Sequence, residues 1–180
     1  MKRVLHTIAI ASAIFAMQAA AQGGLPSWER AIAQDNSFSI ETPCSGAVIE
    51  QLRKAPPELS KGLILPPQSR VMCATSELRF VAGVIEGPVG KVSIFDELLS
   101  EARADPTAEG TPSLTSINGH RAYLNRQTAG NRVVQAGVVE VSANKIVLLI
   151  AGTQSDATLS VEDQNAIIDK FYQSLRISVK

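Results

Sequence analysis

The sequence predicts an α+β fold in which an antiparallel meander sheet is flanked by helices. Residues 114–151 contain four extended runs separated by three tight-turn signals, and connections this short force neighbouring strands to run antiparallel. Residues 160–177 form a capped amphipathic segment whose apolar stripe can cover such a sheet. The last extended run, residues 146–151, does not alternate apolar with polar side chains, so we expect it to lie centrally with both faces covered.

The first expected element is a short helix over residues 26–32. Ser27 is placed to cap it, and Trp28 and Ile32 fall on one face at helical spacing. Trp28 is the single tryptophan of the chain. A tryptophan in such a pattern is typically a core anchor, and stacking on a ligand is the alternative.

Two strands are expected next. Residues 37–41 alternate polar with apolar side chains and stop at a proline, which predicts a strand with Phe38 and Ile40 turned inward. We expect a second strand over residues 47–52.

A proline-rich loop follows over residues 54–68. Two proline pairs bracket Leu63, Ile64 and Leu65. A proline has no backbone N–H to donate and disrupts a helix, so the segment is not expected to be regular. Successive side chains of an extended segment leave on opposite faces, so at least one of these three residues is expected to be exposed. If the protein has a protein partner, we expect these three residues to contact it; the other interpretation, which we favour, is that the loop folds back and seals one end of the core.

The middle of the chain predicts two strands and a helix. The strands cover residues 70–73 and 78–85, joined by a short turn at 75–77. Ser93 and Asp96 stand in capping-box positions for the helix, and residues 105–112 read as a linker. The apolar face of this helix comprises Phe95, Leu98, Leu99 and Ala102.

The meander depends on its turns. Asn118-Gly119 is the strongest signal, because this pair accepts the positive φ angles of a two-residue type I′ hairpin. Residues 129–131 and 142–144 repeat the signal more weakly and separate strands at 133–141 and 145–151. For the last apolar run, a buried helix is the alternative.

The closing helix uses the same capping device as the middle one. Ser160 and Asp163 form its capping box. Its apolar stripe comprises Ile167, Ile168, Phe171, Tyr172 and Leu175.

Several of these features together resemble a known group of proteins. They are the opening strand Phe38-Ser39-Ile40-Glu41-Thr42-Pro43, the mid-chain helix, the turn Ile117-Asn118-Gly119-His120-Arg121-Ala122, an apolar strand, and a final helix running into Ser174-Leu175-Arg176-Ile177. This pattern is similar to the small α/β/α sandwiches of the Mog1 and PsbP-like group. The resemblance implies an antiparallel sheet flanked by helices, and roles as binding or assembly factors rather than as enzymes.

The first 21 residues have the layout of a secretory signal peptide. Lys2 and Arg3 precede an apolar centre over residues 8–17, and small residues lead up to Ala21. An uncleaved anchor is the alternative, but this centre is shorter than the roughly 20 residues that span a bilayer. We expect cleavage between Ala21 and Gln22, leaving residues 22–180 as one soluble α+β domain that is periplasmic or secreted.

The two cysteines, Cys44 and Cys73, both lie in the expected mature part. An even pair in an exported protein normally forms a disulfide. Metal binding is the weaker interpretation, since a tetrahedral site needs four ligands and His120 is the single histidine left after cleavage.

Charge and motifs exclude several functions. Removing Lys2 and Arg3 leaves 15 basic against 17 acidic side chains, which gives no basic surface for nucleic acid. We expect no metal, no cofactor and no stable membrane insertion. The favoured function is a non-enzymatic binding or assembly accessory module for an envelope protein or a small ligand; the alternative is a small hydrolase that relies on His120.

Overall fold

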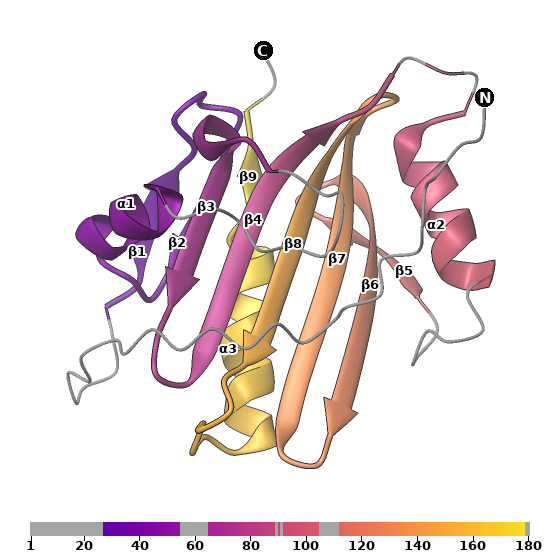
Figure 1. Ribbon diagram of the computed structural model, residues 1–180. Coiled ribbons are helices and arrows are strands. Elements are labelled where there is room, and N and C mark those ends of the chain that lie inside the picture. Colours follow the sequence, from indigo (N-terminus) through magenta and orange to yellow (C-terminus); the bar gives the residue numbers. More distant parts are fainter. Residues whose placement is uncertain (1–26, 55–64, 89, 91, 105–111, 179–180) are drawn as a thin grey trace.

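The computed structural model describes residues 27–54, 65–88, 90, 92–104 and 112–178 (Figure 1). A short 3₁₀ turn, Pro67–Ser69, precedes the third strand. The elements are β1 (Glu29–Ile32), β2 (Phe38–Thr42), α1 (Gly46–Lys54), β3 (Arg70–Ala74), β4 (Leu78–Glu86), α2 (Ile94–Ala104), β5 (Ser113–Ile117), β6 (His120–Ala129), β7 (Arg132–Ser142), β8 (Lys145–Thr153), α3 (Val161–Gln173) and β9 (Arg176–Ile177).

The strands form two antiparallel sheets. The larger sheet has six strands in the order β3-β4-β8-β7-β6-β5, and the smaller has three in the order β1-β2-β9. β8 lies between β4 and β7, and its residues 146–149 are all buried. The expected meander and the central position of the apolar strand are therefore confirmed.

The hairpin between β5 and β6 confirms the predicted turn chemistry. Asn118 has φ 49° and Gly119 has φ 85°, as the two central residues of a type I′ turn require. Ile117 lies opposite His120 on either side of this turn. The turn fixes the register of the pair, and with it the face of the sheet on which each side chain lies.

Helices cover both faces of the larger sheet (Figure 1). On one face, Phe80 of β4 packs against Phe171 of α3, with ring centroids 4.9 Å apart. On the other, Phe95 of α2 packs against Tyr123 of β6 at 5.5 Å. Successive side chains of each strand point to opposite faces of the sheet, so one set packs against α3 and the other against α2. The result is the predicted α+β arrangement of an antiparallel sheet flanked by helices.

Two early elements differ from their predictions. Residues 29–32 are strand β1 rather than a helix: Ala31 is buried and Ile32 is exposed, because the segment pairs with β2 instead of closing its own turns. Residues 46–54 are helix α1 rather than a strand. Ile49 and Arg53, four positions apart, form its buried face, and the helix packs against β3.

Both capping boxes are present, but the closing helix is shorter than predicted. The Ser160 Oγ accepts a hydrogen bond from the Asp163 N–H at 3.1 Å, and Ser93 does the same for Asp96 at 3.1 Å. α3 ends at Gln173, and the next residue, Ser174, bonds in two directions. Its Oγ donates a hydrogen bond to the Phe171 backbone oxygen in the last turn of the helix, and it accepts one from the backbone N–H of Glu41 in β2. The following residues form β9. No helix in the described part of the chain is long and apolar enough to cross a membrane.

Candidate functional site

An open depression of about 320 Å³ lies where the last turns of α3 meet the smaller sheet. Strands β1 and β2 supply one wall, α3 supplies another, and β9 closes the end. Residues far apart in the sequence therefore share one surface. The lining residues are Arg30, Glu41, Ala166, Asp169, Lys170, Gln173, Ser174 and Arg176.

The strand wall is held by an ion pair. Arg30 and Glu41 are register partners in the β1–β2 ladder, and the Arg30 Nη2 lies 2.6 Å from the Glu41 Oε1. The Arg30 Nη1 also donates to the backbone oxygen of Ser174, at 3.3 Å. One guanidinium thus ties the smaller sheet to the residue that follows α3, beside the depression.

Two cations of the depression, Lys170 of α3 and Arg176 of β9, have no carboxylate partner among the described residues. The Lys170 Nζ lies over the ring of Trp28, 4.3 Å from its centroid, and the Arg176 Nη1 donates to the backbone oxygens of Gln173 and Leu175. Among the described residues, neither cation makes an ion pair with a carboxylate, whereas Asp169 is paired with Arg126. An incoming anionic group would therefore meet two available cations here.

Trp28 acts as an anchor under this surface. Its ring packs edge-on against Phe80 at 6.4 Å, and the side chain lies against the main hydrophobic core. The core-anchor interpretation of Trp28 is therefore confirmed. Its outer face holds Lys170 in place by a cation–π contact, which is favourable over tryptophan.

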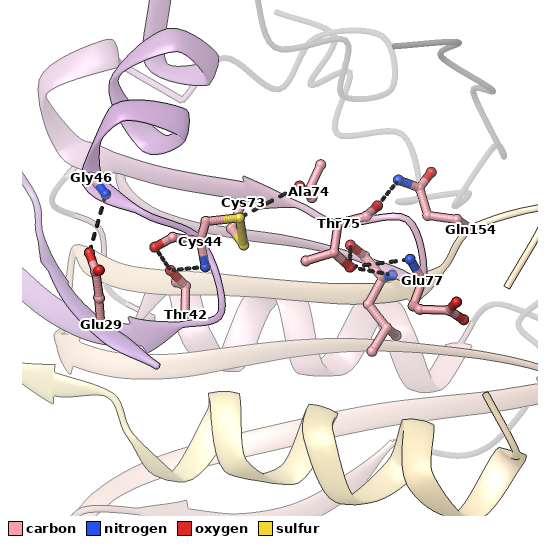
Figure 2. The surroundings of a disulfide bond; sticks show 10 residues. Glu29, Thr42, Cys44, Gly46, Cys73, Ala74, Thr75, Glu77 and Gln154 are labelled. Carbon is pink, nitrogen blue, oxygen red and sulfur yellow. Dashed lines mark hydrogen bonds between the residues drawn. A yellow bond between two sulfur atoms is a disulfide. The ribbon is translucent and has the colours of Figure 1, made fainter. Parts of the chain in front are cut away.

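The two cysteines meet as predicted from their number and expected compartment. The Cys44 and Cys73 sulfur atoms are 2.12 Å apart, with 5.7 Å between the Cα atoms. Figure 2 shows the bond beside Thr42, whose hydroxyl accepts the Cys44 backbone N–H. Cys44 follows β2 and Cys73 lies in β3, so the bond joins the smaller sheet to the larger one.

The predicted partner contact is not supported at Leu65. This side chain is fully buried and lies over Gly83 of β4, where an added Cβ would come within 2.7 Å of a Leu65 methyl group. The Arg70 guanidinium donates to the backbone oxygens of Leu65 and Arg53, which fixes this part of the chain against the sheet. The Leu65 side chain is therefore part of the core; Leu63 and Ile64 lie outside the described residues, as do Ala21 and Gln22.

His120 lies just after the β5–β6 turn and is half-buried. Its Nδ1 is 3.2 Å from the backbone oxygen of Glu140. In the described part of the chain, the ring makes no hydrogen bond with a hydroxyl, thiol or carboxylate that could act with it, and no group of three metal-ligating side chains is found. The geometry therefore offers no support for a His120-dependent hydrolase.

Sequence reasoning did not single out Arg30, Lys170 or Arg176. A basic residue in the last turn of a helix is common, because it complements the negative end of the helix dipole. Recognition of the depression needed the pairing of β2 with β9, which joins residues about 140 positions apart.

The fold and the depression together define a small α+β protein with an open, partly cationic surface site. No known protein family matches the chain, and no curated protein matches its sequence.

Solved structures with a similar fold include three from different sources. A protein of Bacteroides thetaiotaomicron is 9% identical with a TM-score of 0.47, covering 84% of this chain and 48% of its own, so the chain spans about half its length. The Ran-binding protein Mog1p of Saccharomyces cerevisiae is 8% identical with a TM-score of 0.48, over 84% of this chain and 96% of its own. LpqN of Mycobacterium tuberculosis, which is involved in cell envelope biogenesis, is 13% identical with a TM-score of 0.39, over 87% of each chain. Mog1p belongs to the group that the sequence resembles.

Proposed function

We propose that this chain is an exported, non-enzymatic binding or assembly accessory module of the cell envelope, and that the depression receives an acidic segment of a protein partner. The observation that carries the proposal is the pair of cations, Lys170 and Arg176, that line the depression without a carboxylate partner among the described residues. A carboxylate or another anionic group of the partner would supply the missing counter-charge.

The shape of the site favours a protein over a small molecule. Small-molecule sites are concave and enclose most of the ligand surface, whereas this depression is open and lined chiefly by charged side chains. Exposed ion pairs each add about 0–1 kcal/mol, and they act mainly on the association rate and on partner choice. Binding should therefore weaken as the salt concentration rises.

Two features support the proposed compartment. The N-terminal residues 1–21 have the charged, apolar and small-residue regions of a signal peptide. The bond between Cys44 and Cys73 suits an oxidising compartment, because disulfides persist outside the cytosol. Intact-mass analysis of the exported protein should give a chain that begins at Gln22, and a species that retains Met1 would contradict cleavage.

The binding proposal is tested by charge reversal with a matched control. The test variant is Lys170→Glu with Arg176→Glu, and the control is Arg103→Glu with Arg132→Glu, which makes the same change in net charge at exposed positions outside the depression. Each protein is immobilised and exposed to native envelope extract at low and at high salt, and captured proteins are identified by mass spectrometry. The proposal expects a protein retained by the wild type and the control but lost from the test variant; equal capture by all three would overturn it.

A further inference from the structure

The outer edge of β5 pairs with no other described strand. β5 ends the larger sheet and pairs with β6 alone among the described strands. Residues 113–116 are all exposed, and Leu114 is one of the few large apolar residues at the surface, with 54% of its area accessible. The opposite edge, β3, differs, because α1 packs against it (Figure 1).

β5 also lacks the features that usually keep an edge strand from pairing with another chain. Its sequence, Ser-Leu-Thr-Ser-Ile, contains no charged residue and no proline. Its register with β6 is continuous, without a bulge. Edge strands of soluble proteins are normally protected by charge, proline, a bulge or a covering element, so an open and neutral edge indicates a place for a further strand.

The register fixes which backbone groups point outward. Ile117 and His120 flank a two-residue turn, which makes them a hydrogen-bonded pair. Hydrogen-bonded pairs alternate along an antiparallel ladder, so Ser113, Thr115 and Ile117 direct their N–H and C=O groups toward β6. Leu114 and Ser116 direct theirs to the open edge.

We propose that two copies of this chain associate through antiparallel pairing of their β5 strands, with Thr115 opposite the partner's Thr115. In this register each Leu114 faces the partner's Ser116, and the outward groups of both copies form roughly four backbone hydrogen bonds. A register centred on Leu114 would place Ser116 opposite the partner's Pro112, which has no N–H to donate. A register centred on Ser116 would place Leu114 opposite the partner's Asn118, which lies in the turn.

The side chains favour a second copy over an unlike strand. Because β5 is uncharged, two copies bring no like charges into opposition. Thr115 and the partner's Thr115 form a cross-strand pair of a favourable type. The exposed Leu114 and the partner's Leu114 lie on the same face at diagonal positions, within reach of long side chains, so each covers the other's apolar surface.

The association should be weak and reversible. Pairing of two five-residue strands buries much less than the roughly 1,600 Å² of a standard stable interface. The two six-stranded sheets would become one continuous sheet across the two-fold axis. Dimers are therefore expected to form as the protein concentration rises and to dissociate on dilution.

Cysteine cross-linking tests the register directly. Thr115→Cys should give a covalent dimer on mild oxidation, because its two thiols would face each other within the roughly 7 Å Cα separation that a disulfide allows. Ser113→Cys is the control: it is also exposed, but its thiols would lie roughly 13 Å apart in the proposed register. Both variants retain the native Cys44–Cys73 bond. Equal cross-linking of the two variants, or none in Thr115→Cys, would overturn the proposal.

Sedimentation velocity gives a second measurement without added thiols. The sedimentation coefficient of the wild type should rise with concentration, and Ser116→Lys, which places a charge on each edge, should abolish the rise. Ser100→Lys on the exposed face of α2 is the control and should behave as the wild type. A coefficient independent of concentration in the wild type would also overturn the proposal, as would covalent capture of a different protein in place of a second copy.

Discussion

Replacing Gly137 with alanine should destabilise the fold by a steric conflict with α3. Gly137 lies in β7, and an added Cβ would stand 2.6 Å from the Tyr172 Cε1 and 2.7 Å from a methyl group of Leu124. Tyr172 cannot move aside freely, because its hydroxyl is held 2.8 Å from the Gln135 backbone oxygen and 2.9 Å from that of Leu149. The new methyl group must displace one of these neighbours.

The magnitude follows from three contributions. Overpacking a well-packed core costs about 1–3 kcal/mol, and displacing the tyrosine hydroxyl loses a net hydrogen-bond contribution of about 1 kcal/mol. Alanine also lowers the backbone entropy of the unfolded chain, which stabilises the folded protein by about 0.5–1 kcal/mol. The net loss is about 2 kcal/mol, which corresponds to a fall in Tm of about 4–8 °C for a chain of this size.

Gly152 provides the matched control within the same sheet. An added Cβ there meets a methyl group of Val134 at 3.5 Å, an ordinary contact. Gly152→Ala should therefore leave the free energy of unfolding unchanged or raise it by about 0.5–1 kcal/mol. Urea denaturation of both variants measures the difference, and the reasoning fails if Gly137→Ala is as stable as Gly152→Ala.

Three further predictions concern stability. Leu65→Ala should lower the free energy of unfolding by about 2–5 kcal/mol, because the side chain is fully buried; an unchanged urea midpoint would contradict its place in the core. Replacing Cys44 and Cys73 together by alanine should cost about 3–4 kcal/mol for their sequence separation of 29, and calorimetry showing no fall in Tm would refute this. Burial by itself raises the pKa of Asp35, but hydrogen bonds, chiefly from Ser37, outweigh it and hold the pKa below 3.8. A depressed pKa stabilises the fold at any pH above the pKa of Asp35 in the unfolded chain, and this stabilisation is lost as the pH falls through the pKa of Asp35 in the folded chain. Asp35→Asn should therefore lose less stability than the wild type between about pH 6 and about pH 3. Parallel profiles of stability against pH for the two proteins would refute this prediction.

The parts of the fold that local physics controls could be predicted from the sequence. Asn118 and Gly119 specify a turn that depends only on their own backbone angles. Ser93 and Ser160 cap their helices through bonds to residues three positions away. The meander and the two longer helices follow from these signals and from their apolar periodicity.

The short elements could not be predicted, because distant partners decide them. The apolar residues of segment 29–32 are spaced as in a helix, but the segment forms a strand because it pairs with β2 through backbone hydrogen bonds. The two residues of β9 have no signal of their own and exist through pairing with Phe38 and Ser39. The depression is made at this junction, so Lys170 and Arg176 read in the sequence as ordinary cations near a helix end.

The pairing of β9 with β2 sets the order in which the molecule can be completed. β1 and β2 emerge early in synthesis, but the third strand of their sheet includes Ile177, which pairs with Phe38. The smaller sheet therefore has no complete form until residue 177 has left the ribosome, whereas the β5–β8 meander can form from consecutive segments. Contacts of such long sequence separation slow folding. A chain truncated after Leu175 should accordingly protect the backbone amides of the meander from hydrogen exchange, while the edge of β2 that pairs with β9 in the full chain stays unprotected.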